Sequence, residues 1–417
     1  MLRFASKTIA LCAAVMLAAS PALAAATPPA ADELQPIRMH PSWLPAGLGA
    51  DATVILVPGT ADLTEVTGDD IAGGTSRFGG DQYGRSVAIG FYDPHHPQVE
   101  FVEYPQALGV TVLGRPVELT GSGTYNGSVD VGTATGMRLA DRAWAAQGRT
   151  GTIILNGYSQ SAPIAMNIAY LEHRRALAGD PTAIPAENIV VVNGADTRFP
   201  NTGIETVIPS FADGAYTNGP RNEADTGDIR VISYCIRGDT VCGMGNPLAD
   251  PFATAFYALP GATIHGKKGD LVNQYPVEKT WTVGNTTYVV LDAGNPWGVW
   301  ARSKGIDVPH SVDDTLDALV PVPMPGAAAT DAAGTEIPTP RAVQVQITHA
   351  LGGQVPVTDP DARAQEAAAG TSTSTSTATT PSAPAAPVAP LAALAAADPI
   401  TADLITAVRD LLPAPLR

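Results

Sequence analysis

The sequence predicts an α/β fold in which a mostly parallel central sheet is covered by helices on both faces. Between about residues 36 and 320, short apolar runs rich in β-branched residues alternate with segments whose apolar residues recur at helical spacing. This alternation is typical of successive β-α-β units. One such run, at 151–156, leads through Gly157 and Ser159 straight into a helical segment, which indicates a tight strand–turn–helix connection.

The expected elements follow this pattern along the chain. The first two strands are expected within 53–60 and 99–105, where β-branched and aromatic residues recur. Segments 128–147 and 162–178 read as helices, and Pro163 falls in the first turn of the second one, where its missing N–H costs nothing. The remaining strands are expected at 151–156, 188–194, 228–234 and 286–291.

The first 24 residues have the pattern of a signal peptide. Arg3 and Lys7 precede an apolar stretch at 8–19, and small residues before and at Ala24 form a cleavage site. The apolar stretch is short for a helix that spans a membrane, so we expect cleavage after Ala24. The rest of the chain is then secreted or held in the cell envelope.

From about Val320 the composition shifts to Ala, Pro, Thr and Ser. Such a stretch buries too little apolar surface to offset its ordering entropy. We therefore expect one folded domain at 36–320, followed by a disordered tail at 321–417 that acts as a spacer. The final stretch, 399–416, regains apolar residues at helical spacing, so a short surface-docking helix and a frayed end both stay open.

Charge and cysteine usage exclude several classes of protein. The net charge of −16 argues against nucleic acid as a partner. Cys12 would leave with the signal peptide, and the remaining pair, Cys235 and Cys242, is expected to form a disulfide outside the cytoplasm. Closing so short a loop is worth roughly 2.5 kcal/mol, so it chiefly stiffens the loop. Two thiols without a nearby histidine make no metal site, and no metal or organic cofactor is expected.

The stretch Gly157-Tyr-Ser-Gln-Ser161 has the spacing of a serine nucleophile elbow. A strand that turns directly into a helix strains the backbone at Ser159, so small residues are needed two positions before and after it. The same turn directs the backbone N–H of Gln160 and the helix N-terminus at the place where an oxyanion would develop. A second donor is expected in the loop after the first strand, at Gly59–Thr60.

A serine nucleophile needs a histidine to accept its proton and a carboxylate to orient that histidine. In α/β-hydrolases the acid follows the serine in the chain and leaves the end of a later strand. Asp239 follows the strand at 228–234 and lies between the two cysteines, so it is the preferred acid. Asp196, which follows the strand at 188–194, is the competing candidate.

For the base, this order excludes four of the seven histidines and leaves His265, His310 and His349. His265 lies in Gly261-Ala-Thr-Ile-His-Gly266 and is the preferred base, expected in an active-site loop. His310 is the reserve. His349 lies in the low-complexity region, which makes it the poorest candidate. The excluded residues are His40, His95, His96 and His173.

Several stretches together resemble the PE-PPE-domain serine hydrolases of mycobacteria and their relatives, which are themselves similar to cutinases. They are Tyr104-Pro105, the elbow at 157–162, and the segments 193–203 and 262–266; the segment 235–242 resembles the cutinase loop with an aspartate between paired cysteines. Over roughly residues 50–300, the resemblance implies a cutinase-like α/β-hydrolase. Carried over by position, its triad is Ser159, Asp239 and His265, with Thr60 and Gln160 around the oxyanion.

The sequence also departs from this family. Ser161 replaces the commoner glycine of the elbow, and Gly-Lys-Lys-Gly follows His265 where an aromatic residue often stands. A signal-like segment, in place of a PE or PPE helical module, precedes the domain.

The resemblance implies an esterase or acyltransferase that acts on acyl esters of envelope lipids or glycolipids through an acyl-enzyme, in association with the cell wall or a membrane surface. The alternative is a catalytically inactive envelope-binding protein on a hydrolase fold, and a peptidase is a third possibility.

Overall fold

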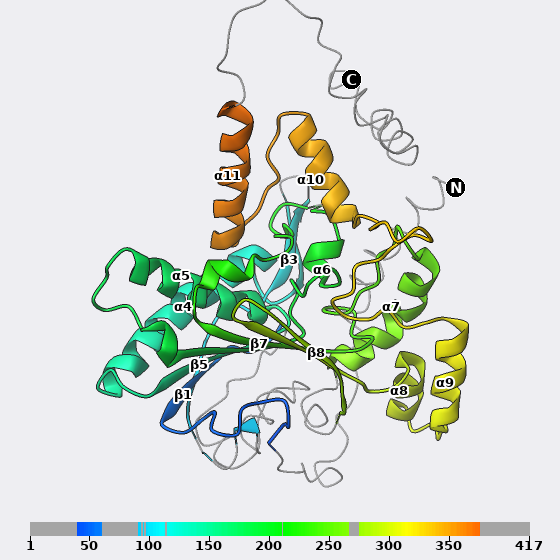
Figure 1. The fold of residues 1–417 in the computed structure, drawn as a ribbon, viewed down its shortest axis with the longest axis horizontal. Helices are drawn as coiled ribbons and strands as arrows, with labels where there is room; N and C mark the ends of the chain where they lie inside the picture. Colours follow the sequence, from blue (N-terminus) through cyan, green and yellow to red (C-terminus); the bar gives the residue numbers. More distant parts are fainter. Residues whose placement is uncertain are drawn as a thin grey trace, which may run out of the picture.

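The computed structural model describes residues 40–60, 91–92, 95, 97–112, 115–210, 212–266 and 275–375. At its centre is a seven-stranded sheet with the strand order β2-β1-β5-β6-β7-β9-β8 (Figure 1). All neighbouring strands are parallel except β8, which pairs antiparallel with β9 at the edge. The strands of this sheet are β1 (Ala52–Leu56), β2 (Gln98–Phe101), β5 (Thr152–Tyr158), β6 (Ile189–Gly194), β7 (Arg230–Ile236), β8 (Val277–Val283) and β9 (Thr286–Leu291).

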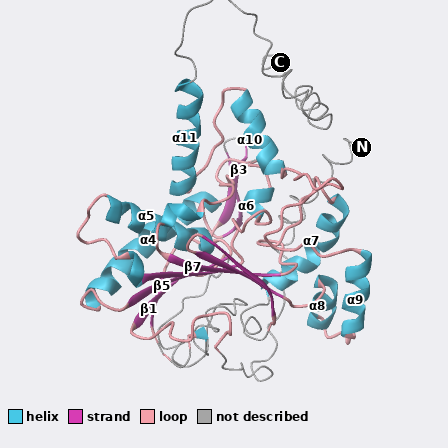
Figure 2. Cartoon of the chain, in the orientation of Figure 1, coloured by secondary structure: helices cyan, strands magenta, loops and turns pink. Residues whose placement is uncertain are grey.

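The buried strands alternate their side chains between two apolar layers, as the two-residue period of a strand requires. Val54 and Leu56 of β1 lie in one layer, and Ile55 lies in the other. Helices α4 (Tyr125–Ala146) and α5 (Ser161–Leu177) cover the layer of Ile55, and Figure 2 shows both on the same side of the sheet. The opposite layer is covered by residues 41–50, by Phe91 and Tyr92, and by Ile264 of a later helix.

This architecture confirms the predicted α/β fold, and all six predicted strands and both predicted helices are present. Among the strands, two features escaped sequence analysis. β8 is exposed along most of its length and carries polar and charged residues, so it lacks the apolar run of the buried strands. A separate antiparallel hairpin, β3 (Leu108–Val112) and β4 (Arg115–Thr120), stands apart from the main sheet.

Three further helices lie together at the β8–β9 end of the sheet, on the right in Figure 1. They are α7 (Pro251–Gly266), α8 (Pro296–Ser303) and α9 (His310–Leu319). The short helix α6 (Ile204–Val207) and two single 3-10 turns, Ala186–Asn188 and Glu223–Thr226, occupy the connections on either side of β6. Because β1, β5, β6 and β7 are parallel, their carboxyl ends lie along one edge of the sheet. Loops at such an edge can carry a functional site.

The chain stays folded beyond the boundary expected at Val320. Residues 321–375 include α10 (Pro340–Ala350) and α11 (Pro360–Thr375), which stand above the sheet in Figure 1. Thr339 is the N-cap of α10: its hydroxyl accepts from Ala342 N and donates to Thr206 O at 2.8 Å. Helix α10 contacts α6 and α11 contacts α5, so this part of the predicted tail belongs to the folded domain.

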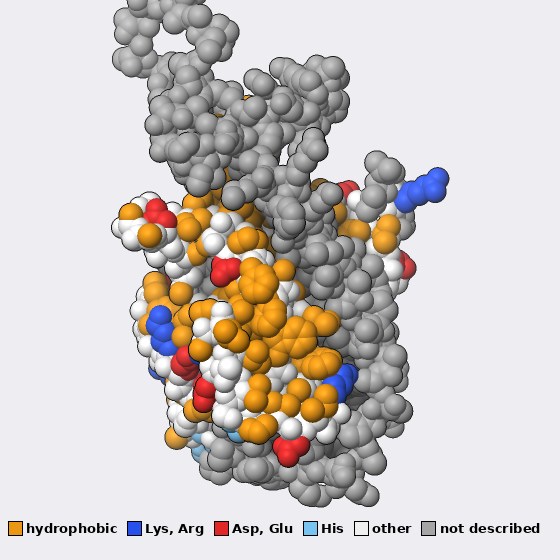
Figure 3. Space-filling model, turned by 90° about the vertical axis from the view of Figure 1, so that its right-hand side faces the viewer, with side chains coloured by type: hydrophobic (Ala, Val, Ile, Leu, Met, Phe, Trp, Pro, Cys, Tyr) orange, Lys and Arg blue, Asp and Glu red, His pale blue; other side chains and the backbone are white. Residues whose placement is uncertain are grey.

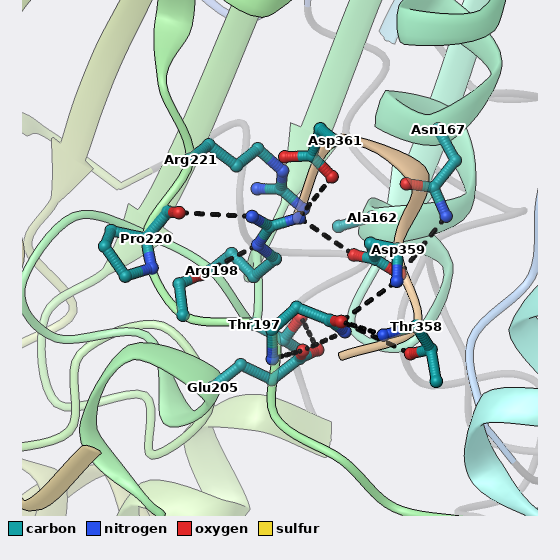
Figure 4. Close-up of polar contacts among 12 residues, drawn as sticks. Ala162, Asn167, Thr197, Arg198, Glu205, Pro220, Arg221, Thr358, Asp359 and Asp361 are labelled. Atoms are coloured by element: carbon teal, nitrogen blue, oxygen red, sulfur yellow. Dashed lines mark hydrogen bonds and ion pairs between the residues drawn. The ribbon is translucent and has the colours of Figure 1, made fainter. Parts of the chain in front are cut away.

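A buried ionic cluster holds this C-terminal segment to the loop after β6 (Figure 4). Nη1 of Arg198 lies 2.9 Å from Asp359 Oδ2 and 2.8 Å from Asp361 Oδ1, and all three side chains are almost completely buried. Asn167 of α5 donates to Asp359, and Asn218 Oδ1 accepts from the backbone N–H of Asp359 at 2.9 Å. Because a buried charge needs such partners, the cluster fixes the start of α11 against the core.

Two predictions about the chain ends lie outside the described residues. The signal peptide at 1–24 and the tail from 376 onward, with its terminal stretch at 399–416, stay predictions. Within the described ranges, no helix is both long and apolar enough to cross a membrane.

Candidate active site

The turn after β5 has the strained geometry of a nucleophile elbow. Ser159 has a φ of 58°, a left-handed conformation that costs energy for a residue other than glycine. Gly157 is required here because a Cβ at this position would meet Ser161 O at 2.6 Å and Asn193 Oδ1 at 2.7 Å. The hydroxyl of Ser161 accepts a hydrogen bond from Tyr158 N at 2.7 Å and donates one to Val57 O, also at 2.7 Å. Ser161 therefore ties the turn to the residue that follows β1, a role that sequence analysis did not predict because it considered only the small size of this residue.

His265 reaches this serine from the last turn of α7. Its Nε2 lies 2.9 Å from Ser159 Oγ. The expectation that His265 lies in a loop was wrong, because α7 continues through Pro260 to Gly266. Gly261 permits the close approach of this helix to the loop after β7, since a Cβ there would lie 2.3 Å from Gly238 O.

Asp239, in the loop after β7, is the third side chain of this hydrogen-bonded series. Both of its carboxylate oxygens lie 3.0 Å from His265 Nδ1, and the residue is fully buried. Oδ1 also accepts from Val241 N at 2.7 Å, which fixes the carboxylate within its own turn. The predicted disulfide between Cys235 and Cys242 is present and brackets Asp239.

The three side chains have the connectivity that general-base activation requires. If Nδ1 carries its proton toward Asp239, Nε2 is left as an acceptor for the Ser159 hydroxyl. Only 9 % of the Ser159 surface and 20 % of the His265 side chain are exposed. The arrangement can therefore move a proton from Oγ to the imidazole in a site largely shielded from water.

Tyr158, which sequence analysis did not single out, is a fourth member of this group. Its hydroxyl donates to His265 O at 3.0 Å and lies 3.0 Å from His265 Nδ1. Its ring lies against the imidazole, with 5.3 Å between the centroids. Because Tyr158 directly precedes the nucleophile, its position in the elbow was the available signal, but nothing in the sequence pairs it with a residue on α7.

The expected oxyanion residues lie beside the nucleophile. A Cβ on Gly59 would be 3.7 Å from the Cβ of Ser159, which places this loop directly against the serine. The hydroxyl of Thr60 donates to Gln160 Oε1 at 3.1 Å, and Gln160 Nε2 donates to Ala107 O at 2.7 Å. The buried Gln160 side chain thus clamps the Thr60 loop, while its backbone N–H occupies the N-cap position of α5.

The competing candidates have other partners. Asp196 accepts from Arg198 N and forms an ion pair with Arg221. His310 begins α9 with its side chain 84 % exposed, and its Nδ1 faces Asp313 at 3.2 Å. His349 Nε2 lies 2.7 Å from Glu366. His265 is therefore the histidine that the described part of the chain brings to Ser159.

A metal centre finds no support in the same part of the molecule. Within the described ranges, no three or more His, Cys, Asp or Glu side chains are grouped so that they could hold an ion. Ser159, His265 and Asp239 together can offer a nucleophilic hydroxyl with its acid–base partners.

Comparisons with known proteins leave the family open. No protein-family model matches the chain, and no curated protein matches it significantly. One solved structure that it resembles is an acetylxylan esterase, with 18 % sequence identity and a TM-score of 0.30 over 52 % of this chain and 99 % of that chain. A similarity at this TM-score carries no argument about the fold or the function. The resemblance to PE-PPE-domain hydrolases stays a prediction.

Proposed function

We propose that the protein is a serine esterase or acyltransferase in which Ser159, His265 and Asp239 act as a triad. The observation that carries the proposal is the unbroken hydrogen-bonded row from Ser159 Oγ through the imidazole to the Asp239 carboxylate, at 2.9 and 3.0 Å. The strained backbone at Ser159 supports it independently, because such strain is maintained where a site needs it.

In the proposed reaction, Ser159 Oγ attacks an ester carbonyl while His265 Nε2 takes its proton. The tetrahedral oxyanion is held by the backbone N–H of Gln160 and by a donor at Thr60. The C–O bond to the alcohol then breaks, and His265 returns the proton to the leaving oxygen. Water or an acceptor hydroxyl resolves the acyl-enzyme by the same steps in reverse, with hydrolysis or acyl transfer as the outcome.

Labelling with a fluorophosphonate tests the nucleophile directly. The probe should form one P–O bond to Ser159 Oγ with loss of fluoride. Ser159→Ala should abolish labelling and lower kcat for ester hydrolysis by at least about 10⁴-fold. Ser311→Ala, at an exposed serine of α9, is the matched control and should label normally. A parent protein that takes no label, beside a control esterase that does, would leave an inactive binding protein as the alternative.

The proposed substrates are acyl esters of cell-envelope lipids or glycolipids. Their support is the family resemblance of the sequence motifs, which also leaves hydrolysis and transfer to be separated. A p-nitrophenyl ester series of increasing chain length, run with and without trehalose as acceptor, addresses both. Formation of an acylated sugar at the expense of free acid would identify a transferase.

We also propose that the protein is exported and is secreted or held at the envelope. The signal-like segment 1–24 and the disulfide support this, because disulfides persist in oxidising compartments. Protein recovered outside the cell should begin at Ala25. An intact N-terminus on intracellular protein would contradict export.

A further inference from the structure

Helix α7 carries no charged residue along its 16 positions. Its solvent-facing side carries large apolar side chains: Phe252 is 64 % exposed and Leu259 is 49 % exposed, with Ala255 exposed between them. A surface helix ordinarily turns polar residues to water. An uncharged, aromatic outer face on the helix that supports His265 therefore calls for a function.

The apolar surface continues onto the neighbouring helices. Phe252 stacks on Phe256, with 5.6 Å between ring centroids, and Phe256 meets Trp297 of α8 at 5.6 Å. Trp297 in turn meets Trp300 at 5.6 Å, and Leu319, at the end of α9, is 73 % exposed. Figure 3 looks onto this side of the molecule and shows apolar side chains gathered across it. We call these residues of α7, α8 and α9 the aromatic surface.

A second copy of the chain is a poor occupant for this surface. Its three large exposed side chains, Phe252, Leu259 and Leu319, present on the order of 350 Å². A stable protein–protein interface buries about 800 Å² on each partner, of which roughly 450 Å² is apolar, and the three side chains fall short of that apolar area. Charges of both signs flank the aromatic surface, since exposed Asp250 directly precedes α7 and exposed Asp314 lies on α9, while exposed Lys304 caps the end of α8. Self-association would also bring together two chains that each have a net charge of −16.

We infer that the aromatic surface docks on an uncharged lipid layer. Apolar and aromatic side chains enter such a layer without a protein partner of matching shape, and aromatic rings favour its interface with water. The net charge of −16 is compatible with a neutral lipid surface and opposes binding to an anionic one. The inference rests on the proposed function for its purpose, because lipid esters are water-insoluble substrates.

The position of α7 explains how docking would serve the site. The helix begins at the aromatic surface and ends at His265, thirteen residues after Phe252, so the two are roughly 20 Å apart along its axis. A lipid layer held at the outer face of α7 therefore lies within one helix length of Ser159. Docking would raise the local concentration of lipid esters without changing the chemistry at the serine.

Flotation with phosphatidylcholine vesicles tests this inference on the full-length protein. Phe252→Ser/Leu259→Ser should weaken binding about 100-fold, because two large apolar side chains lose their burial. Leu177→Ser/Leu351→Ser is the matched control: both leucines are 64 % exposed on other elements, and this variant should bind like the parent. Hydrolysis of a soluble short-chain ester should be the same in all three proteins, which shows that the site is intact.

Ser159→Ala should bind vesicles like the parent while hydrolysing nothing, so loss of the proposed function and loss of docking are told apart. The inference is wrong if the parent does not bind phosphatidylcholine, or if the two double variants bind equally. Stronger binding when phosphatidylglycerol is added would contradict the uncharged layer. A parent dimer that the Phe252/Leu259 variant converts to monomer would identify a second copy as the occupant.

Discussion

The imidazole of His265 is held from three directions. Asp239 contacts its Nδ1 with both oxygens, Tyr158 contacts the same nitrogen and the backbone carbonyl, and Ser159 contacts Nε2. Ring orientation is therefore fixed before a substrate binds, which is what a general base needs. Tyr158 acts through the histidine, as a positioning residue.

Tyr158→Phe removes this hydroxyl and keeps the ring. We expect kcat for ester hydrolysis to fall about tenfold with KM nearly unchanged, because the loss affects proton transfer and leaves substrate contacts alone. The rate of fluorophosphonate labelling should fall by the same factor. Tyr170→Phe, on the body of α5, is the control. A change confined to KM would assign Tyr158 to substrate binding.

At the scale of single residues, the sequence predicts Ser159, His265 and Asp239 but few of the side chains that hold them in place. Ser159 is predicted from the spacing of the elbow, and Asp239 is predicted from the cysteines on either side of it; both are local sequence patterns. Tyr158 and the Gln160 side chain act on residues some 50 to 100 positions away, and no local pattern records such contacts.

Among the elements, the loop from Cys235 to Cys242 determines the position of Asp239. It leaves the carboxyl end of β7, carries Asp239 at its centre and packs under Gly261 of α7. The disulfide restricts this loop where the carboxylate must stay in contact with His265. Its effect should therefore be larger on the site than on the fold.

Cys235→Ala/Cys242→Ala tests this difference. The free energy of unfolding should fall by roughly 2.5 kcal/mol, the chain-entropy value for so short a loop, while kcat should fall at least about 30-fold because the acid is no longer held. Denaturant unfolding and steady-state kinetics give the two numbers. Equal activity in the double variant and the parent would show that Val241 N and the turn alone fix Asp239.

Sequence patterning captured the buried strands better than the later helices. Strands such as β6, which is buried at every position, read as apolar runs because both faces are covered. His265 was expected in a loop because Gly266 follows it, but it lies in the last turn of α7. In the folded chain, Gly261 is needed for contact with the neighbouring loop, and this tertiary requirement overrides local preference.

At the scale of the whole molecule, ion pairs between residues far apart in the sequence hold the segment 321–375 against the rest of the domain. Arg198 faces two carboxylates, Asp359 and Asp361, while Glu205 and Arg221 lie near the same group. Composition alone placed Asp359 and Asp361 in a disordered tail, since an ion pair with a residue 161 positions earlier leaves no local signal. Burial raises the pKa of Asp359 to about 7, aided by Glu205 and Asp361 and opposed by Arg198. Burial also acts on Asp361, but its pairing with Arg198 lowers that pKa.

Asp359→Asn should flatten the pH dependence of stability. Folded Asp359 keeps its proton up to about pH 7, and an unfolded Asp loses it near pH 4, so the folded state binds more protons in that window. The contribution of this group to stability therefore falls as the pH rises from about 4 to about 7. Between about pH 5 and about pH 8 the parent should lose about 5 °C more in Tm than the variant.

The measurement is a pair of thermal unfolding series across this range. Asp314→Asn, at an exposed carboxylate of α9, is the control and should follow the parent. Parallel curves for parent and Asp359→Asn would mean that Asp359 is ionised throughout and that its pairing with Arg198 outweighs burial.

The ionic cluster also sets a minimum length for a stable domain. Arg198 precedes Asp359 by 161 positions, and without Asp359 and Asp361 the burial of its guanidinium costs several kcal/mol. A polypeptide that ends at Val320 would therefore leave part of its core open to proteases.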